Sequence, residues 1–363
     1  MRTPLYQKHV EHKARMVPFA GWDMPIQYTG IVAEHHHTRK AASIFDICHM
    51  GEFELSGPSA EADLERLITM SVSTIHRNQC RYGYLLRENG GVLDDLTCYR
   101  LGDERFMLVV NAGTRDTDAA WIKQHLASST TFTDRSDALA KLDIQGPESR
   151  EAMEAALGHA LPDLKYFRCE EMTLNGVDVL LSRTGYTGEW GYELYLPVDE
   201  AGRFWDLFLT DERIQPAGLG ARDTLRLEVG YPLYGHELAE GQSPVSASRG
   251  MFVDLSKDFI GKSTVERELD EGVDQVLVGL MLEGRRAARA GDPVMREGTK
   301  VGQVTSGSFA PSLGVAAALA YVDQELAAPG ETLDISIRGQ FLLGKVVETP
   351  MYRNGTARKK SSS

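Results

Sequence analysis

The feature that most restricts the fold of this sequence is a change of pattern after Asp274. Helix-like and strand-like segments alternate before it, whereas short β-prone runs separated by Gly, Pro and Asp follow it. These runs are 276–283, 292–295, 302–306, 317–322, 332–337 and 342–348. Short strands with frequent turns are typical of a small β-barrel or sandwich, so we predict a separate C-terminal β domain at 275–350. The polar, basic segment 354–363 is predicted to be a disordered tail.

Residues 1–265 carry the mixed pattern of an α+β fold. Residue spacing predicts helices at 31–42, 59–69, 116–126, 148–156 and 200–209, and strands at 51–56 and 138–145. Asn175-Gly176 lies between two β-prone runs within 172–182, which is a strong hairpin signal. The 363 residues allow two or three domains, and a hydrophobic fraction of 42% is sufficient for large cores.

Charge and cysteine usage exclude several classes of function. A formal charge of −13 and a pI near 5.3 argue against nucleic acid or an anionic membrane as partner, because both would repel the chain. There is no apolar run of about 18 residues and no signal-peptide core. The cysteines lack C-x-x-C spacing and are predicted to be reduced core thiols; they are Cys48, Cys80, Cys98 and Cys169. We therefore expect a cytoplasmic protein, or a mitochondrial matrix protein without its transit peptide if the source has mitochondria.

Residues 90–113 contain the most promising chemistry. Two β-prone runs flank a Gly-Asp turn, which predicts a hairpin whose first strand carries the adjacent acids Asp94 and Asp95. Neighbouring strand residues point to opposite faces, so one carboxylate can face solvent or stabilise the turn while the other enters a cavity. The alternative is that both acids simply decorate the end of a strand.

Three features resemble metal or nucleotide sites but do not satisfy their geometry. Consecutive helical residues such as His35, His36 and His37 point about 100° apart and cannot converge on one ion, so we interpret them as a solvated helix face and predict no metal site. GKST at 261–264 has Ser256 where a phosphate loop needs its first glycine. The lone G-x-G in 218–230 is too weak for a dinucleotide site, although such a helix N-terminus presents amides to an anion or carbonyl.

Eight segments occur in a fixed order along almost the whole chain, from Thr3 to about Tyr352. They are TPLYQKHVEHKARMVPFAGWDMPIQY, FDICHMGEFELSGP, GGVLDDLTCYR, LDIQGPESR, RTGYTGEWGYELYLP, GLGARDTLRLEVGYPLYGHEL, DFIGK and GQVTSGSFAPSLG. As a set they resemble the T-protein of the glycine cleavage system, the aminomethyltransferase family.

This resemblance implies a three-domain cloverleaf around a central folate site, with two intertwined α+β domains in 1–265 and a C-terminal β-barrel. It implies transfer of a one-carbon unit from the aminomethyl-lipoyl arm of the H-protein to tetrahydrofolate, with release of ammonia. The reaction involves an iminium-like carbon, whose positive charge a nearby carboxylate stabilises. The resemblance also suggests a monomer that meets the H-protein transiently.

The resemblance assigns site residues by their place in these segments. Asp95 matches the catalytic acid, Glu193 the acceptor of the pterin N–H donors, and Arg222 a guanidinium that binds a folate oxygen or carboxylate. The remaining matches line the site and are Tyr82, Tyr99, Asn111, Tyr186 and Met50. On pattern alone, Glu193 could face solvent, Arg222 could belong to a solvated helix face, and the tyrosines could be core.

The sequence departs from the family pattern at Trp190, Ser246 and Met251, and again at Met70 and Ser71. Folate-contacting positions are retained, so tetrahydrofolate is better supported than the donor. One alternative is a folate-dependent demethylase or methyltransferase that acts on a small methylated substrate. The other is a non-catalytic folate-binding protein, which the retention of Asp95 disfavours. A fused flavin domain has no room in this chain.

Overall fold

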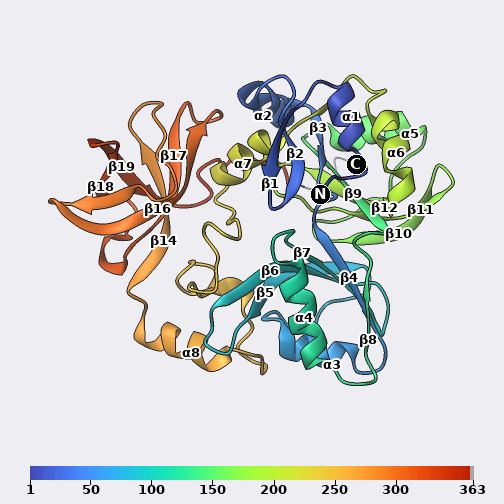
Figure 1. The fold of residues 1–363 in the computed structure, drawn as a ribbon, viewed down its shortest axis with the longest axis horizontal. Helices are drawn as coiled ribbons and strands as arrows, with labels where there is room; N and C mark the ends of the chain where they lie inside the picture. The colour runs from blue at the N-terminus through green and yellow to red at the C-terminus, as the bar shows by residue number, and fades with distance from the viewer. Residues whose placement is uncertain (360–363) are drawn as a thin grey trace.

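Two large sheets, a small two-stranded sheet and a closed barrel form three lobes in the computed structural model, which describes residues 1–359 (Figure 1). The two lobes that contain the sheets lie beside each other, and the barrel lies at the other end of the longest axis. This mixed architecture with a C-terminal barrel confirms the predicted fold class. No helix among the described residues is long and apolar enough to cross a membrane.

The first lobe is built on a six-stranded sheet in the order β10-β11-β12-β9-β3-β13. Its strands are β3 (Ala42–Asp46), β9 (Leu139–Gln145), β10 (Cys169–Leu174), β11 (Val177–Ser182), β12 (Gly191–Pro197) and β13 (Ile214–Pro216). Leu142 and Leu194 are buried in one core with the helices α5 (Ser149–Leu157) and α6 (Ala201–Phe208). Because side chains alternate along a strand, Lys141, Asp143 and Glu193 point to the opposite face of this sheet.

Several N-terminal elements and two later helices complete this lobe. They are α1 (Tyr6–Glu11), β1 (Arg15–Phe19), β2 (Trp22–Gln27), α2 (Ile31–Lys40), η1 (Val198–Glu200) and α7 (Leu219–Glu228). Helix α7 contacts α2 and β2 as well as the barrel, so it links the first lobe to the C-terminal domain.

The second lobe holds a five-stranded sheet in the order β5-β6-β7-β4-β8. Its elements are β4 (Gly51–Ser56), β5 (Gln79–Leu86), β6 (Val92–Arg100), β7 (Arg105–Val110), β8 (Thr131–Asp134), α3 (Ala60–Leu67) and α4 (Arg115–His125). Leu96 and Leu108 are buried with the helices α3 and α4 on one face. On the other face, Tyr99 packs with Tyr195 of the first sheet, so the two sheets share a small core.

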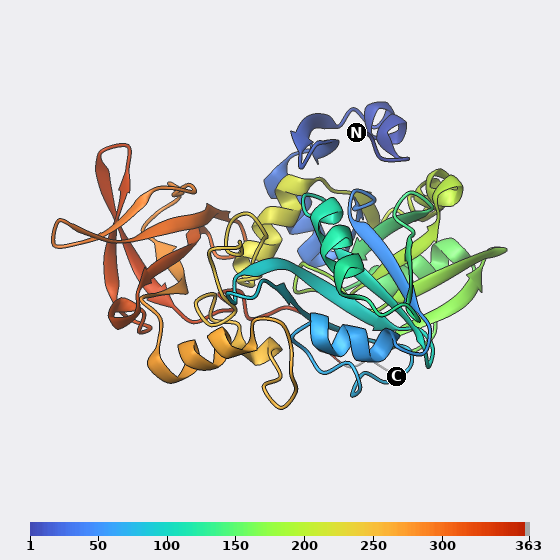
Figure 2. The same cartoon turned by 60° about the horizontal axis from the view of Figure 1, so that its bottom comes forward.

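The C-terminal domain is a closed barrel in the order β14-β17-β16-β15-β18-β19. Its elements are β14 (Gln275–Leu282), β15 (Pro293–Arg296), β16 (Thr299–Ala310), β17 (Val315–Asp323), η3 (Gln324–Leu326), β18 (Thr332–Ile337) and β19 (Gln340–Val347). Alternate strand residues such as Ala318, Ala320 and Ile335 fill its interior. Helix α8 (Lys262–Glu271), which follows η2 (Gly250–Phe252), runs between the barrel and the second lobe (Figure 2).

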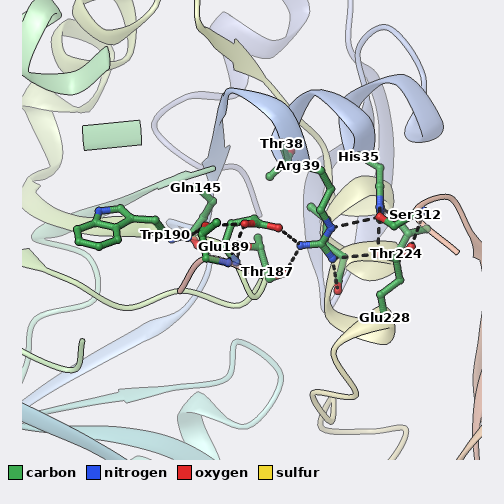
Figure 3. Close-up of polar contacts among 12 residues, drawn as sticks. His35, Thr38, Arg39, Gln145, Thr187, Glu189, Trp190, Thr224, Glu228 and Ser312 are labelled. Carbon is green, nitrogen blue, oxygen red and sulfur yellow. Dashed lines mark hydrogen bonds and ion pairs between the residues drawn. The ribbon is translucent and has the colours of Figure 1, made fainter. Parts of the chain in front are cut away.

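A buried polar network joins α2, α7 and the barrel (Figure 3). The two guanidinium nitrogens of Arg39 donate to Glu189 Oε1 at 2.9 Å and to Glu228 Oε2 at 3.0 Å. His35 Nε2 lies 2.8 Å from Ser312 Oγ and 3.2 Å from Glu228 Oε2. The Arg39 and Glu228 side chains are only 5% and 0% exposed, so this ion pair is part of the packed interior that holds the barrel loop to the first lobe.

The interpretation of the three histidines as a solvated helix face is therefore wrong for His35. This residue is fully buried, and its Nδ1 lies 2.8 Å from Thr224 Oγ1. Burial lowers the pKa of His35 in spite of the neighbouring Glu228 carboxylate. Charge patterning along α2 could not reveal that α7 and a barrel loop cover this side of the helix.

The predicted disordered tail also differs from the structure over residues 354–359, which pack against the first lobe. Thr356 Oγ1 donates to Glu189 Oε2 at 2.6 Å. Arg183 donates to the carbonyl oxygens of Ala357 and Lys359 at 3.0 and 2.7 Å. These hydrogen bonds hold residues 354–359 in place, although their composition suggested disorder. The rest of the predicted tail, 360–363, lies outside the described residues.

Replacing Glu228 by alanine should destabilise the fold strongly. The change leaves the Arg39 guanidinium buried without one of its two carboxylate partners, which costs about 3–5 kcal/mol when one member of a buried pair is removed. Glu240, which pairs with Arg87 and is 54% exposed, supplies the control, and its alanine variant should lose less than about 1 kcal/mol. Urea unfolding measures both variants, and similar losses would contradict the structural role of the buried network.

Candidate active site

Asp95 lies on the face of β6 that points toward the first lobe. The side chains of Leu96 and Cys98 alternate with it and belong to the core under the helices. Tyr82 Oη donates to Asp95 Oδ2 at 2.9 Å, and Asn111 Nδ2 donates to Asp95 Oδ1 at 2.8 Å. Burial, with a contribution from the negative charge of Asp94, raises the pKa of Asp95 to about 7. The structure thus brings three of the predicted residues together around one carboxyl whose charge changes near neutral pH.

Asp94 has a positioning role rather than contact with solvent. It is fully buried, and it accepts the backbone N–H of Asn111 at 2.9 Å and Asn111 Nδ2 at 2.8 Å. Asp118 on α4 is also fully buried, close enough for the charge of Asp94 to act on it. Burial and the charge of Asp94 raise the pKa of Asp118 to about 10, which favours the protonated form of Asp118 at neutral pH. The strand end therefore holds a chain of contacts from Asp94 through Asn111 to Asp95.

Glu193 lies on β12, on the polar face of the first sheet, and is only 8% exposed. Lys141 Nζ lies 3.1 Å from its Oε1, and Thr184 Oγ1 donates to its Oε2 at 2.7 Å. Burial opposes ionisation, but Lys141 and Thr184 together hold the pKa of Glu193 below its usual value. The solvent-facing alternative for Glu193 is wrong, because Tyr99 and its neighbours cover the strand.

Arg222 points from α7 into the same polar region. Its Nη1 donates to Asp143 Oδ2 at 2.5 Å, and its guanidinium lies 4.8 Å from the centre of the Tyr186 ring. The Arg222 side chain is 14% exposed, which excludes an ordinary solvated face. Tyr186 donates its hydroxyl to the carbonyl of Pro232, and burial raises the pKa of this hydroxyl. Tyr186 therefore packs beside Arg222 at this polar region.

The two remaining predicted residues lie at the junction of the sheets. Tyr99 Oη is 3.1 Å from Tyr195 Oη and 3.4 Å from Glu193 Oε2. Met50 packs beside Tyr99, with its sulfur 3.8 Å from Lys141 Nζ. Both are largely core residues that also form the wall near Glu193.

Three charged or polar residues near this wall were not predicted as site residues. They are His49, Lys141 and Asp143, which lie within two of the family-like segments or directly beside one of them. Among residues 1–359, His49 Nδ1 and Asp143 Oδ1 are buried and have no hydrogen-bond partner. Burial lowers the pKa of His49 to about 4, so its imidazole is neutral. The sequence signal for Lys141 and Asp143 was the alternation of charged and apolar residues from Lys141 to Asp143. The same alternation is typical of an ordinary half-buried strand, so it does not identify site residues.

The N-terminus of α7 differs from the expected free anion site. The backbone N–H of Gly218 donates to Glu34 Oε2 at 2.9 Å. The other Glu34 oxygen accepts the N–H groups of Tyr28, Thr29 and Gly30 at 2.6–3.0 Å. The chain thus supplies its own carboxylate there.

A cavity of about 630 Å³ borders the site at Tyr82. Three positions that depart from the family pattern line it, namely Met70, Ser71 and Met251, and Met251 is 77% exposed. Trp190 and Ser246 are not among its lining residues. Trp190 is buried, and the Arg183 guanidinium carbon lies 3.3 Å from the centre of its ring. Ser246 accepts a hydrogen bond from the backbone N–H of Ser243 in its own turn. The residues that differ from the family pattern therefore form two groups, one that lines the cavity and one that packs elsewhere.

Comparison with protein-family models gives two matches. The model described as the GCVT N-terminal domain matches residues 5–257. The model described as the glycine cleavage T-protein C-terminal barrel domain matches residues 275–353.

Curated relatives and a solved structure match the chain over almost its full length. The aminomethyltransferase of Desulfitobacterium hafniense is 42% identical over 97% of this chain and 98% of its own. That of Cutibacterium acnes is 43% identical, with the same shares covered. The crystal structure of the glycine cleavage system aminomethyltransferase T from Bartonella henselae is 32% identical and superposes with a TM-score of 0.93 over 98% of this chain and 99% of that one.

Proposed function

The chain belongs to the glycine cleavage T-protein family and is an aminomethyltransferase, and on that premise we propose that it transfers the one-carbon unit of aminomethyl-lipoyl H-protein to tetrahydrofolate, with release of ammonia. The observation that carries this proposal is Asp95, a buried carboxyl that two other predicted site residues orient and whose pKa lies near 7. In the overall reaction, two folate nitrogens bond to the methylene carbon while its bonds to the amine and to sulfur break. The two protons from the folate nitrogens leave with the ammonia and the dihydrolipoyl thiol.

In this proposal the Asp95 carboxylate stabilises the positive charge of the iminium-like carbon. A fixed negative charge in a buried site acts strongly on a cation that develops beside it, because little water screens it. Tyr82 and Asn111 fix the direction of both carboxylate oxygens, so the stabilisation needs no rearrangement during the reaction. Asp94 keeps Asn111 in place.

Glu193 and Arg222 bind the folate in this proposal. The Glu193 carboxylate is held ionised and suits the flat N–H donor edge of a pterin, and Arg222 suits a folate oxygen. The unsatisfied buried atoms of His49 and Asp143 fit a polar ring system that enters between the sheets. The donor of the one-carbon unit can reach the Tyr82–Asp95 pair through the cavity at Tyr82. We also propose a monomer that works in the cytoplasm and meets the H-protein transiently.

The direct test mixes the protein with tetrahydrofolate and aminomethylated lipoyl H-protein, with free aminomethylated lipoate as the control donor. Folate-dependent ammonia release together with methylenetetrahydrofolate supports the proposal. Tight folate binding without turnover would overturn the assigned donor and direct the search to small methylated compounds, since Met70, Ser71 and Met251 line the cavity.

Turnover should rise with pH between about pH 6 and 8, because the active form of Asp95 is the carboxylate and its pKa is about 7. The negative charge of Asp94 contributes to that raised pKa, so Asp94→Asn should move the midpoint of the profile to lower pH. The profile of kcat against pH checks both statements. A midpoint that stays fixed in Asp94→Asn would show that another group controls it.

A further inference from the structure

Lys141 is a buried ammonium group that the proposed reaction does not yet use. It is 3% exposed, and its side chain lies on the polar face of β9, where the first sheet meets the second. Its Nζ lies 3.1 Å from Glu193 Oε1, 3.8 Å from Met50 Sδ and 5.1 Å from the centre of the Tyr195 ring. An ammonium has three N–H donors, and in residues 1–359 these contacts use one strongly and one weakly. One donor therefore remains for a ligand.

The Glu193 carboxylate has room for two ligand donors. A carboxylate has about four lone-pair positions, of which Lys141 uses one on Oε1 and Thr184 one on Oε2. The hydroxyls of Tyr99 and Tyr195 also donate to Oε2, but at 3.4 Å these hydrogen bonds are longer and weaker than usual, so a ligand N–H can replace them. Each Glu193 oxygen can thus accept one hydrogen bond from a ligand. A pterin offers two adjacent donors on one edge, the N–H of ring atom N3 and an N–H of the 2-amino group.

The atom next to N3 on that edge is the C4 carbonyl oxygen, which needs a donor when the ring is buried. We propose that Lys141 donates a hydrogen bond to the C4 carbonyl of the pterin, while Glu193 accepts from N3 and the 2-amino group, so that the pair selects 4-oxo over 4-amino pterins. A 4-amino group would instead direct its own N–H donors at the ammonium, and neither side would have a partner. This inference rests on the proposed folate site and adds a residue that decides which pterin binds there.

Folic acid and aminopterin are the probes, because aminopterin has an amino group in place of the C4 oxygen and, as a consequence, no hydrogen on N3. The N3 difference concerns Glu193 and is the same in every Lys141 variant, so a change in the ratio of the two affinities reports on Lys141. Wild-type protein should bind folic acid more tightly. In Lys141→Met, folic acid affinity should fall by about 10- to 100-fold, as for loss of a hydrogen bond to a charged group, while aminopterin affinity should stay or improve. Lys141→Arg keeps a cationic donor and should retain the preference for folic acid. Lys262→Met, at a surface lysine on α8, is the control that should change neither affinity.

Titration calorimetry of each variant, with thermal unfolding to confirm folding, separates three outcomes. A decrease of at least about tenfold in the ratio of folic acid affinity to aminopterin affinity in Lys141→Met supports the inference. An equal loss for both probes overturns it, because Lys141 would then act only by holding Glu193 in place. Wild-type protein that binds neither probe would instead overturn the folate site itself. If Lys141→Met does not fold, Lys141→Gln offers a neutral side chain of similar reach, and a ratio unchanged from wild type would again overturn the charge-assisted role.

Discussion

Asp95→Asn should lower turnover by roughly 100- to 1,000-fold, which is the typical cost of removing one preorganised electrostatic group. The asparagine side chain has the same shape, and its oxygen can still accept from Tyr82 or Asn111. Folding should not suffer, because burial already disfavours the ionised form of this acid. We therefore expect unchanged tetrahydrofolate affinity and unfolding temperature together with a large loss in kcat.

Asp94→Asn is the matched control, since it changes the neighbouring acid in the same way. Asp94 contacts Asn111 rather than the region between the lobes, so its loss acts on Asp95 indirectly, through the position of Asn111 and through the missing negative charge. The decrease in kcat should therefore be milder than for Asp95→Asn. Equal decreases in the two variants, measured as methylenetetrahydrofolate formed under saturating substrates, would refute the assignment of the second acid.

The acid pair illustrates how much local pattern can predict. Strand alternation alone correctly placed Asp94 and Asp95 on opposite faces, because the β-rich runs on both sides of the turn form the hairpin β6–β7. Alternation could not say which face was covered. Asp94 is buried because α4 packs over its face, and α4 is a separate element about 20 residues later in the chain.

The residues that local pattern misassigned are those whose environment comes from distant segments. His35 is buried by α7 and by Ser312, and residues 354–359 are fixed by Arg183 and Glu189. The barrel strands were located, but the predicted run 302–306 is only the middle of β16 (Thr299–Ala310), since the pairing with β17 extends it at both ends. Register and burial depend on long-range contacts, which a single sequence does not contain.

Glu193 and Arg222 were predicted as site residues, but their partners were not. Their positions came from resemblance to family segments, whereas their partners Lys141 and Asp143 appear only in the structure. The register explains the grouping, because Glu193 is directly opposite Asp143 on the paired strands β12 and β9. Two acids and two basic groups therefore meet on one face, and each acid has a cationic partner. The pairing with Lys141 holds the pKa of Glu193 below its usual value, whereas burial raises the pKa of Asp143 to about 6 in spite of Arg222. An ionised Glu193 is what a donor-rich ligand edge requires.

Glu193→Gln should reduce tetrahydrofolate affinity by about 100-fold or more. A glutamine offers one acceptor oxygen instead of two, and its amide N–H groups would face the N–H groups of the pterin. The change also leaves the Lys141 ammonium buried without its carboxylate, which should destabilise the fold by about 3–5 kcal/mol.

The double variant Glu193→Gln with Lys141→Met separates these two effects. Removing both charges should restore most of the stability, because no unpaired ion is left in the interior. Folate affinity should remain low, because the acceptor for the pterin edge is still missing. Calorimetric titration and urea unfolding of the wild type, the single variant and the double variant measure both quantities. Recovery of affinity together with stability would show that neither side chain contacts the ligand, whereas stability without affinity assigns the Glu193–Lys141 pair to the ligand.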